Sequence, residues 1–374
     1  MISFLRAMFR ALKALLADPG ARATMLVSIV IYSMLYPQPY RTEVVRDMPI
    51  AVIDQDGSGA SRTLFRRIDN ADTVAILASV NSLAEAEEMF FRREVFGVVI
   101  VPPFFERDLL DGRAAPIAAF GDGSYFLAYG SMIRAVSLAA RSLGAEVQYA
   151  RLTTSGTDAA TAIAAVSPVT VTAVPLFNPQ GGYASYVLPA AFVLILQQTL
   201  LMGIGILHAG RRPLSGVDTV ATPLAYLLLY CGWIAGTQLL LPWLYAIPYI
   251  GTAKGLYIVA IPFLTATIAM GFALARLIPW REGVIFLLAV MGLPLFFLSG
   301  MSWPVESVPE PIRTLANLIP STTAMKAMVK IDQMAAPVSA VFDEVGTLLM
   351  LTAGYSAIAL VLSGSWFRKQ TRRS

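Results

Sequence analysis

Residues 186–208 read YVLPAAFVLILQQTLLMGIGILH, a run that contains no Asp, Glu, Lys or Arg. A helix needs about 20 mostly apolar residues to cross the hydrocarbon core of a bilayer. Similar apolar segments lie on either side of this run, at about 22–37, 223–248, 256–278, 284–303 and 344–364. The pattern predicts an α-helical membrane protein with six transmembrane helices, in which 22–37 is the first and 186–364 forms a five-helix transmembrane domain.

Composition separates residues 38–184 from the rest of the chain. The whole sequence is 56% hydrophobic and only 14% charged, whereas a soluble domain carries about 25% charged residues. Residues 38–184 hold 12 of the 28 basic side chains and 16 of the 24 acidic ones. The remaining part is therefore strongly basic. We interpret its excess as a signal of loop orientation rather than of nucleic-acid binding, because no basic cluster adjoins an aromatic platform.

Basic residues occur beside every second loop between the apolar segments. They are Arg6, Arg10, Lys13, Arg22, Arg211, Arg212, Arg276, Arg281, Arg368, Lys369, Arg372 and Arg373. The loop 249–255, on the other side, holds only Lys254. Short loops rich in Lys and Arg stay in the cytoplasm. We therefore expect both termini, including the basic tail 365–374, to be cytoplasmic, and residues 38–184 to lie outside.

The first 17 residues form a separate amphipathic pattern. Apolar side chains repeat at three- and four-residue spacing, while Arg6, Arg10 and Lys13 make a basic stripe. Such a helix lies in the interface of an anionic membrane leaflet. Residues 1–17 are thus a cytoplasmic interfacial helix, which is either a simple anchor or a lever against a cytoplasmic partner.

Residues 38–184 alternate between short β-rich runs and amphipathic helices, which is typical of an α/β domain. The predicted strands are 49–54, 74–78, 95–101 and 116–120. The predicted helices are 61–68, one that begins at Ser82, 104–110 and about 125–152. A capping box, Ser82 to Glu85, opens one helix. We expect one layer of helices on the sheet, with 153–184 as a flexible return to the membrane.

Two loops of this domain resemble ligand sites. Asp54-x-Asp56-Gly57 resembles the start of a calcium loop, but Phe65 occupies the position of the closing Glu, so a turn is favoured. Gly121-Asp122-Gly123-Ser124 is better explained by a helix cap at Asp122 or Ser124 than by a ligand loop.

The sequence lacks the motifs of catalysis and of phosphate binding. It has no G-x-x-x-x-G-K-[ST] run, one histidine, His208, and one cysteine, Cys231. We therefore expect no enzyme activity, no cofactor and no metal in this chain. We expect His208 to reach toward the membrane surface at the end of its helix.

Polar residues inside the apolar segments are amides and hydroxyls rather than carboxylates, which disfavours an ion-coupled carrier. Gln197, Gln198 and Gln238 are the candidates for a substrate path. Hydrogen bonding between helices is the alternative role. After the fifth segment, four prolines between 304 and 320 prevent one continuous helix. They predict a re-entrant or interfacial hairpin near 300–340.

Four stretches together resemble the permease subunits of bacterial type-2 ABC exporters that carry a large domain between the first two helices. They are 6–19, IAVIDQD at 50–56 with FGVVIVPPFFERDLL at 96–110, 178–198, and FLSGMSWPVESVP at 297–309 with 319–322. The resemblance covers nearly the whole chain. It implies a bacterial inner-membrane protein that works as a dimer of permeases, with ATP and Mg²⁺ bound by two separate cytoplasmic ATPase subunits. It also implies export of hydrophobic compounds, often beside a periplasmic adaptor protein.

The loop 209–216 (AGRRPLSG) departs from the family pattern, because no acidic residue precedes Asp218. This departure leaves homodimer and heterodimer open. The residues expected to couple to the ATPase are Arg6, Arg10, Lys13, Arg211, Arg212, Arg281 and Glu282. The alternative function is a non-transporting receptor or scaffold whose outer domain binds a ligand.

Overall fold

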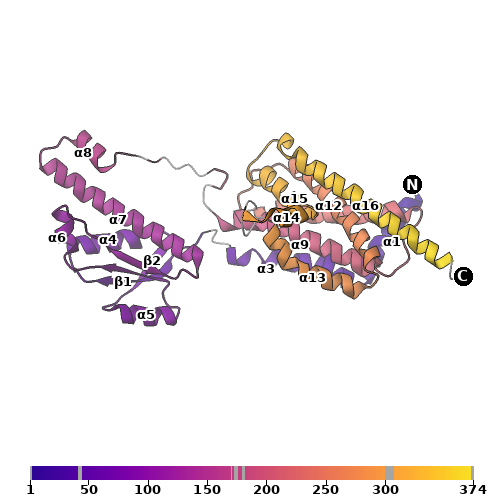
Figure 1. Cartoon of the computed structure of the whole chain (residues 1–374), viewed down its shortest axis with the longest axis horizontal. Helices are drawn as coiled ribbons and strands as arrows, with labels where there is room; N and C mark the ends of the chain where they lie inside the picture. The colour runs from indigo at the N-terminus through magenta and orange to yellow at the C-terminus, as the bar shows by residue number, and fades with distance from the viewer. Residues whose placement is uncertain are drawn as a thin grey trace. The chain divides into compact units, whose positions relative to one another are not determined.

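The computed structural model describes residues 2–40, 44–169, 171, 176–178, 182–299 and 307–371, with side chains up to 364. The chain forms two compact units (Figure 1). One, the helical unit, comprises Met1–Glu43 and Pro175–Ser374, and the other, the α/β unit, comprises Val44–Val174.

Five segments among the described residues are long and apolar enough to cross a membrane. They are α9 (Tyr183–His208), Asp218–Leu244, α12 (Ala253–Leu277), α13 (Arg281–Leu298) and Val338–Gly364. Asp218–Leu244 consists of α10 (Asp218–Ala235), the π-helical turn η3 (Gly236–Leu240) and α11 (Leu241–Leu244). Val338–Gly364 consists of η6 (Val338–Val341) and most of α16 (Phe342–Thr371).

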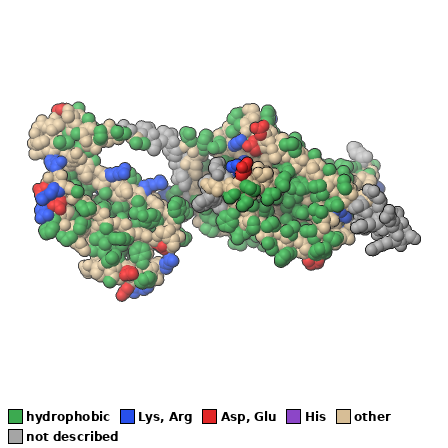
Figure 2. All heavy atoms as spheres, viewed as in Figure 1, with side chains coloured by type: hydrophobic (Ala, Val, Ile, Leu, Met, Phe, Trp, Pro, Cys, Tyr) green, Lys and Arg blue, Asp and Glu red, His purple; other side chains and the backbone are tan. Residues whose placement is uncertain are grey.

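Helix α9 is the centre of the helical unit. Its most apolar window is 83% buried, against 17% for α13 and 6% for the last segment. Figure 2 shows hydrophobic side chains over most of the visible face of this unit. Because a soluble surface of this kind is unfavourable and a lipid-facing one is not, this exposure agrees with a multi-pass membrane protein.

The first apolar segment follows a sharp bend. Helix α1 (Ile2–Ala17) meets Pro19–Tyr40 at 90°, and the count of spans rises to six if this bent pair is one span. The second part contains α2 (Pro19–Arg22), η1 (Ala23–Val27), α3 (Ser28–Leu35) and η2 (Gln38–Tyr40). Asp18 makes the bend because its carboxylate accepts a hydrogen bond from the amide of Ala21 at 3.0 Å. Pro19 then starts the new helix, since it has no N–H group that would need an acceptor there.

The predicted hairpin is described only in part, because 300–306 lie outside the described residues. Helices α14 (Glu310–Ala316) and α15 (Pro320–Met328) follow, and α15 runs into the π-helical turn η5 (Val329–Gln333). Nearly all of α15 is buried, including Ser321 and Thr322 at 2% exposure each. A re-entrant position in the membrane stays a prediction.

The α/β unit contains a four-stranded mixed sheet in the order β2-β1-β3-β4. Strand β1 is parallel to β2 and β3, and β4 is antiparallel to β3. The strands are β1 (Met48–Asp54), β2 (Val74–Ser79), β3 (Gly97–Val101) and β4 (Ala118–Gly121). The helices are α4 (Gly59–Asp69), α5 (Leu83–Phe91), α6 (Phe105–Leu110), α7 (Phe126–Thr154) and α8 (Ala159–Val166).

Helices cover both faces of this sheet, so the expectation of one helical layer was wrong. Figure 1 shows α5 on one side of the sheet and α4 and α7 on the other. Ile50 and Val52 of β1 pack with α4 and α7, whereas Ala51 and Ile53 pack with α5. Successive side chains of a strand point to opposite faces, and a strand buried on both faces is apolar throughout rather than alternating. Helix α8, capped by Asp158, also interrupts the predicted flexible return 153–184.

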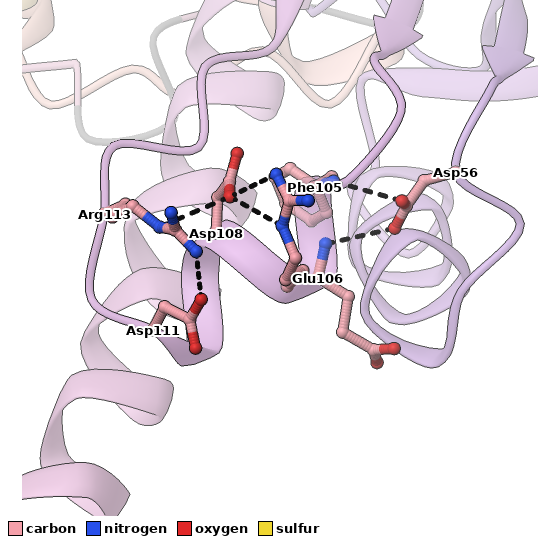
Figure 3. Close-up of polar contacts among 7 residues, drawn as sticks. Asp56, Phe105, Glu106, Asp108, Asp111 and Arg113 are labelled. Atoms are coloured by element: carbon pink, nitrogen blue, oxygen red, sulfur yellow. Dashed lines mark hydrogen bonds and ion pairs between the residues drawn. The ribbon is translucent and has the colours of Figure 1, made fainter.

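The Asp54–Gly57 segment is a turn that fastens two helices, as the sequence favoured. Asp54 accepts the amide of Gly57 at 2.8 Å, and the carboxylate of Asp56 accepts the amides of Phe105 and Glu106 at 3.0 Å each (Figure 3). Burial raises the pKa of Asp56, but hydrogen bonds from Ser58 and from α6 outweigh it and hold that pKa below its usual value. Within the described ranges no three potential ligand side chains are grouped to hold a metal ion.

The 121–124 loop is also an internal turn. Asp122 accepts the amide of Ser124 at 3.0 Å and forms an ion pair with Arg93 at 2.6 Å. The cap of α7 is Tyr125, whose side chain makes no capping hydrogen bond. The predicted side-chain cap at Asp122 or Ser124 is therefore wrong, because the carboxylate of Asp122 binds the amide of Ser124 and the side chain of Arg93 instead of an amide of α7.

Candidate functional site

The predicted coupling residues gather at one end of the helical unit, where α1 packs against α10. Ala7, Ala11 and Leu15 of α1 are buried there, whereas Leu5 and Phe9 are 58% and 71% exposed. Helix α1 thus has an inner face of small side chains, an outer apolar face and a basic stripe between them. The outer face suits a lipid interface, and the inner face ties the helix to the protein.

Two ion pairs connect α1 and its bend to the beginnings of other spans. Arg10 Nη2 lies 2.7 Å from Asp218 Oδ1 at the start of α10. Arg281 Nη1, at the start of α13, lies 3.8 Å from Asp18 Oδ2. Both pairs are solvent-accessible, so each stabilises the fold by at most about 1 kcal/mol. The two pairs tie α1 to the start of α10 and the bend at Asp18 to the start of α13.

The loop after α9 is held against the loop after α12. Arg276 donates to the carbonyl oxygens of His208 and Arg211 at 2.8 and 2.7 Å. Gly210 has φ +69°, and a Cβ there would lie 2.6 Å from the carbonyl oxygen of Pro279. This approach requires glycine. The backbone of the loop is therefore immobilised.

The side chains beside that backbone point outward. Among the described residues, the exposed members of the predicted coupling set are Arg6, Arg10, Lys13, Arg211, Arg212 and Glu282. Of these, only Arg10 forms an ion pair with another element; Glu282 lies 4.0 Å from Arg281, its neighbour. The end of the unit thus presents four exposed cations without an ion-pair partner in the described chain.

Gln197 and Gln198 lie side by side in α9 but have different surroundings. Gln197 is fully buried, and its Oε1 accepts the amide of Ser321 at 2.8 Å, so it caps the beginning of α15. Gln198 points toward α13, where a Cβ added to Gly292 would lie 3.8 Å from its Nε2. Within the described part of the chain, neither polar atom of Gln198 has a hydrogen-bond partner, and the Nε2 of Gln197 has none either.

Gln238 supports the backbone of α9 rather than a neighbouring side chain. It lies in η3 and donates to the carbonyl oxygen of Pro189 at 2.8 Å. Pro189 has no N–H for the carbonyl of Ser185, and Gln333 donates to that carbonyl at 2.9 Å. Gln333 therefore satisfies the carbonyl that the proline leaves without its helical donor, and Gln238 adds a hydrogen bond to the carbonyl of the proline itself. The role of Gln333 was missed, although a proline inside an apolar helix signals the need for such a donor.

Two further side chains differ from the sequence analysis or escaped it. His208 does not reach outward, because its Nε2 lies 2.9 Å from Tyr226 Oη and its ring packs against Phe272. Asp332, in η5, is 3% exposed and accepts a hydrogen bond from Tyr249 at 3.1 Å. Burial raises the pKa of Asp332 to about 7. An isolated acid in a mostly apolar region was the available signal.

An α/β unit between the bent helix pair Ile2–Ala17 and Pro19–Tyr40 and five long apolar segments defines a multi-pass membrane protein with an inserted domain. The sequence model described as ABC-2 family transporter protein matches residues 23–212 and 216–363, and the chain belongs to this family. Permease subunits of the family are non-catalytic, carry no cofactor and work with an ATPase subunit. Bacterial homologues lie in the cytoplasmic membrane.

Two similar proteins span almost the same length. The probable multidrug ABC transporter permease YbhR of Escherichia coli K12 is 21% identical over 94% of this chain and 95% of its own. The linearmycin resistance permease protein LnrN of Bacillus subtilis is 22% identical over 88% of this chain and 90% of its own. The chain is a distant homologue of both.

Proposed function

We propose that this chain is the permease of an ATP-driven exporter that moves a hydrophobic or amphipathic compound, drug-like or lipid-like, out of the cytoplasm or the inner membrane. The names of YbhR and LnrN support the class of cargo. The observation that carries the proposal is the cationic end of the helical unit, where α1 is ion-paired to α10, and the bend at Asp18 is ion-paired to α13. This end offers the surface on which a cytoplasmic ATPase would act.

The contacts supply a route from that surface to the interior. ATP binding on the partner would displace α1, and the ion pairs at Arg10 and Arg281 would carry the displacement to α10 and α13. Helix α13 covers Gln198 of α9 through Gly292. Moving α13 away would expose the unpaired amide of Gln198 to a cargo molecule, next to Gln197, whose Nε2 also lacks a partner among the described residues. This gives the Gln197–Gln198 pair its role in the path.

Orientation follows from the distribution of basic residues. In this proposal the termini and α1 are cytoplasmic, and the α/β unit lies outside, where it would hand over cargo, beside an adaptor protein if one is used. A second permease, identical or different, completes the transporter, and anionic inner-leaflet lipids contact α1.

The test is purification of the tagged chain in mild detergent together with its neighbouring ATPase. We expect a stoichiometric ATPase and vanadate-sensitive hydrolysis. The double substitution Arg211→Glu/Arg212→Glu should abolish stimulated hydrolysis, because both exposed cations face the partner. Lys254→Glu, in the loop expected on the other side, is the control and should retain hydrolysis.

A folded chain that purifies without any ATPase would contradict the exporter. It would favour the alternative of a membrane receptor or scaffold, in which the α/β unit binds a ligand without transport. Equal loss of hydrolysis in the Lys254 control would contradict the assigned coupling loop.

A further inference from the structure

A groove of about 660 Å³ lies between α10, α12 and α16. Thr265 and Thr352 line it near the middle of α12 and α16, and their hydroxyl oxygens are 3.3 Å apart. Arg276 and Ser363 line it near the ends of the same helices. Most of the other lining side chains are apolar.

The groove is as long as one leaflet of a membrane. Thr352 and Ser363 are 11 positions apart in α16, which corresponds to about 16 Å at a rise of 1.5 Å per residue. This is about half of the ~30 Å hydrocarbon core. Val220 and Leu360 on its rim are 63% and 62% exposed. The groove therefore opens sideways, to the leaflet on the side of α1.

The end of the groove at Arg276 is positively charged. Two of the five N–H donors of Arg276 are used by the carbonyls of His208 and Arg211. Arg212 immediately precedes the lining residue Pro213. The acid nearest to Arg212 along the chain, Asp218, is already paired with Arg10 at 2.7 Å, and the acid nearest to Arg276, Glu282, lies 4.0 Å from Arg281. An acidic group at this end would meet cations in a partly apolar setting, where guanidinium groups bind phosphate and carboxylate strongly.

The volume of the groove agrees with a small amphiphilic occupant. A single extended amphiphile fits, since ligand pockets commonly measure about 300–1,000 Å³.

We propose that this groove is the loading site for an anionic amphiphile, with its acidic headgroup at Arg276 and its apolar tail along α16 toward Thr352. This inference rests on the proposed export function and adds to it the class of cargo and the leaflet from which cargo enters. The hydroxyls at Thr265 and Thr352 end the apolar stretch and limit the length of the tail.

The experiment uses the permease with its ATPase in phosphatidylcholine nanodiscs and two photoreactive probes. Both probes carry a diazirine at the end of one acyl chain; one has a phosphatidylglycerol headgroup and the other a phosphatidylcholine headgroup. We expect the anionic probe to label the α16 peptide around Thr352 roughly ten-fold more than the zwitterionic probe, as for a charge-assisted contact. ATP turnover should lower this labelling, because bound cargo leaves.

Three variants test the geometry. Ala359→Phe fills the groove and should lower labelling by the anionic probe about ten-fold. Ala357→Phe, on the other side of α16, is the matched control and should change it less than about two-fold. Arg276→Gln should remove the headgroup preference, and Arg276→Lys should restore most of it, which separates loss of charge from misfolding.

Several outcomes would overturn the inference. Equal labelling by both probes would mean ordinary surrounding lipid, and labelling unaffected by ATP turnover would mean a permanently bound lipid. Disulfide formation between two copies at Leu360→Cys, with no probe labelling, would mean a dimer contact. Labelling before ATP is added requires no hydrolysis. Absence of headgroup-specific labelling would therefore contradict the groove alone, whereas absence of a co-purifying ATPase would contradict the exporter proposal.

Discussion

The same substitution should have opposite effects on the free energy of unfolding at two neighbouring positions, Gln197 and Gln198. Gln197 satisfies the buried amide of Ser321 at 2.8 Å, whereas neither polar atom of Gln198 has a partner. Methionine is similar in size to glutamine and flexible enough to fill either site. Gln197→Met should therefore lower the free energy of unfolding, and Gln198→Met should raise it.

The magnitudes follow from the hydrogen bonds. Loss of the Gln197 acceptor leaves a buried N–H unsatisfied, which costs about 1–3 kcal/mol. The unpaired Nε2 of Gln197 is removed at the same time, so the net loss lies near 1 kcal/mol. Replacing Gln198 removes an amide buried without hydrogen bonds and gains about 1–3 kcal/mol. The two variants should thus differ by roughly 2–4 kcal/mol.

Reversible unfolding in mixed detergent micelles, followed by tryptophan fluorescence, measures this difference. Export by the Gln198→Met variant should fall although the protein is more stable, because the proposed path loses its amide. If Gln198→Met destabilises the protein as much as Gln197→Met does, Gln198 has a partner in the native protein and the reasoning is refuted. If export is unchanged, Gln198 does not contact cargo.

Three further predictions concern other parts of the helical unit. Arg10→Glu and Asp218→Arg should each change the free energy of unfolding by less than about 1 kcal/mol, since the pair is exposed, but each should lower stimulated ATP hydrolysis. The double exchange should restore hydrolysis. If it does not, the pair does not connect the ATPase to α10. Gly203→Ala should cost about 1–3 kcal/mol in unfolding measurements, because the new Cβ would lie 2.2 Å from the side chain of a buried methionine in η1. Gly232→Ala meets nothing within 4 Å and should gain about 0.5–1 kcal/mol; equal effects at both glycines would contradict the packing. Burial raises the pKa of Asp332 to about 7, so the folded state binds the proton of this carboxyl more tightly than the unfolded state does. The free energy of unfolding should therefore fall, by on the order of a few kcal/mol, as pH rises from about 4 through 7. Asp332→Asn should flatten this dependence in a pH series of unfolding curves.

The apolar helices were readable from the sequence because their cause is local. A segment of about 20 apolar residues is required wherever a chain crosses lipid, whatever its neighbours are. The turn at Asp54–Gly57 was also readable, since turn residues act on amides a few positions away.

Partners distant in sequence were not readable. The amides of Gln197 and Gln198 are chemically identical, and only the approach of α15 gives one of them a hydrogen bond. The second helical layer on the sheet escaped prediction because β1 is apolar on both faces, so its sequence shows no alternation to indicate a single buried side. His208 was expected at the surface because the sequence does not show the Tyr226 hydroxyl that holds it inside.

The five apolar segments from residue 183 onward, the amphipathic character of residues 1–17 and the family resemblance therefore came from the sequence. Which face of α1 packs on α10, which amide remains unpaired and where a groove opens between α10, α12 and α16 came from the tertiary structure. The physical reason is the distance along the sequence over which each interaction acts. Hydrophobicity and capping act within one segment, whereas hydrogen-bond satisfaction and cavity shape depend on side chains that folding brings together from far along the chain.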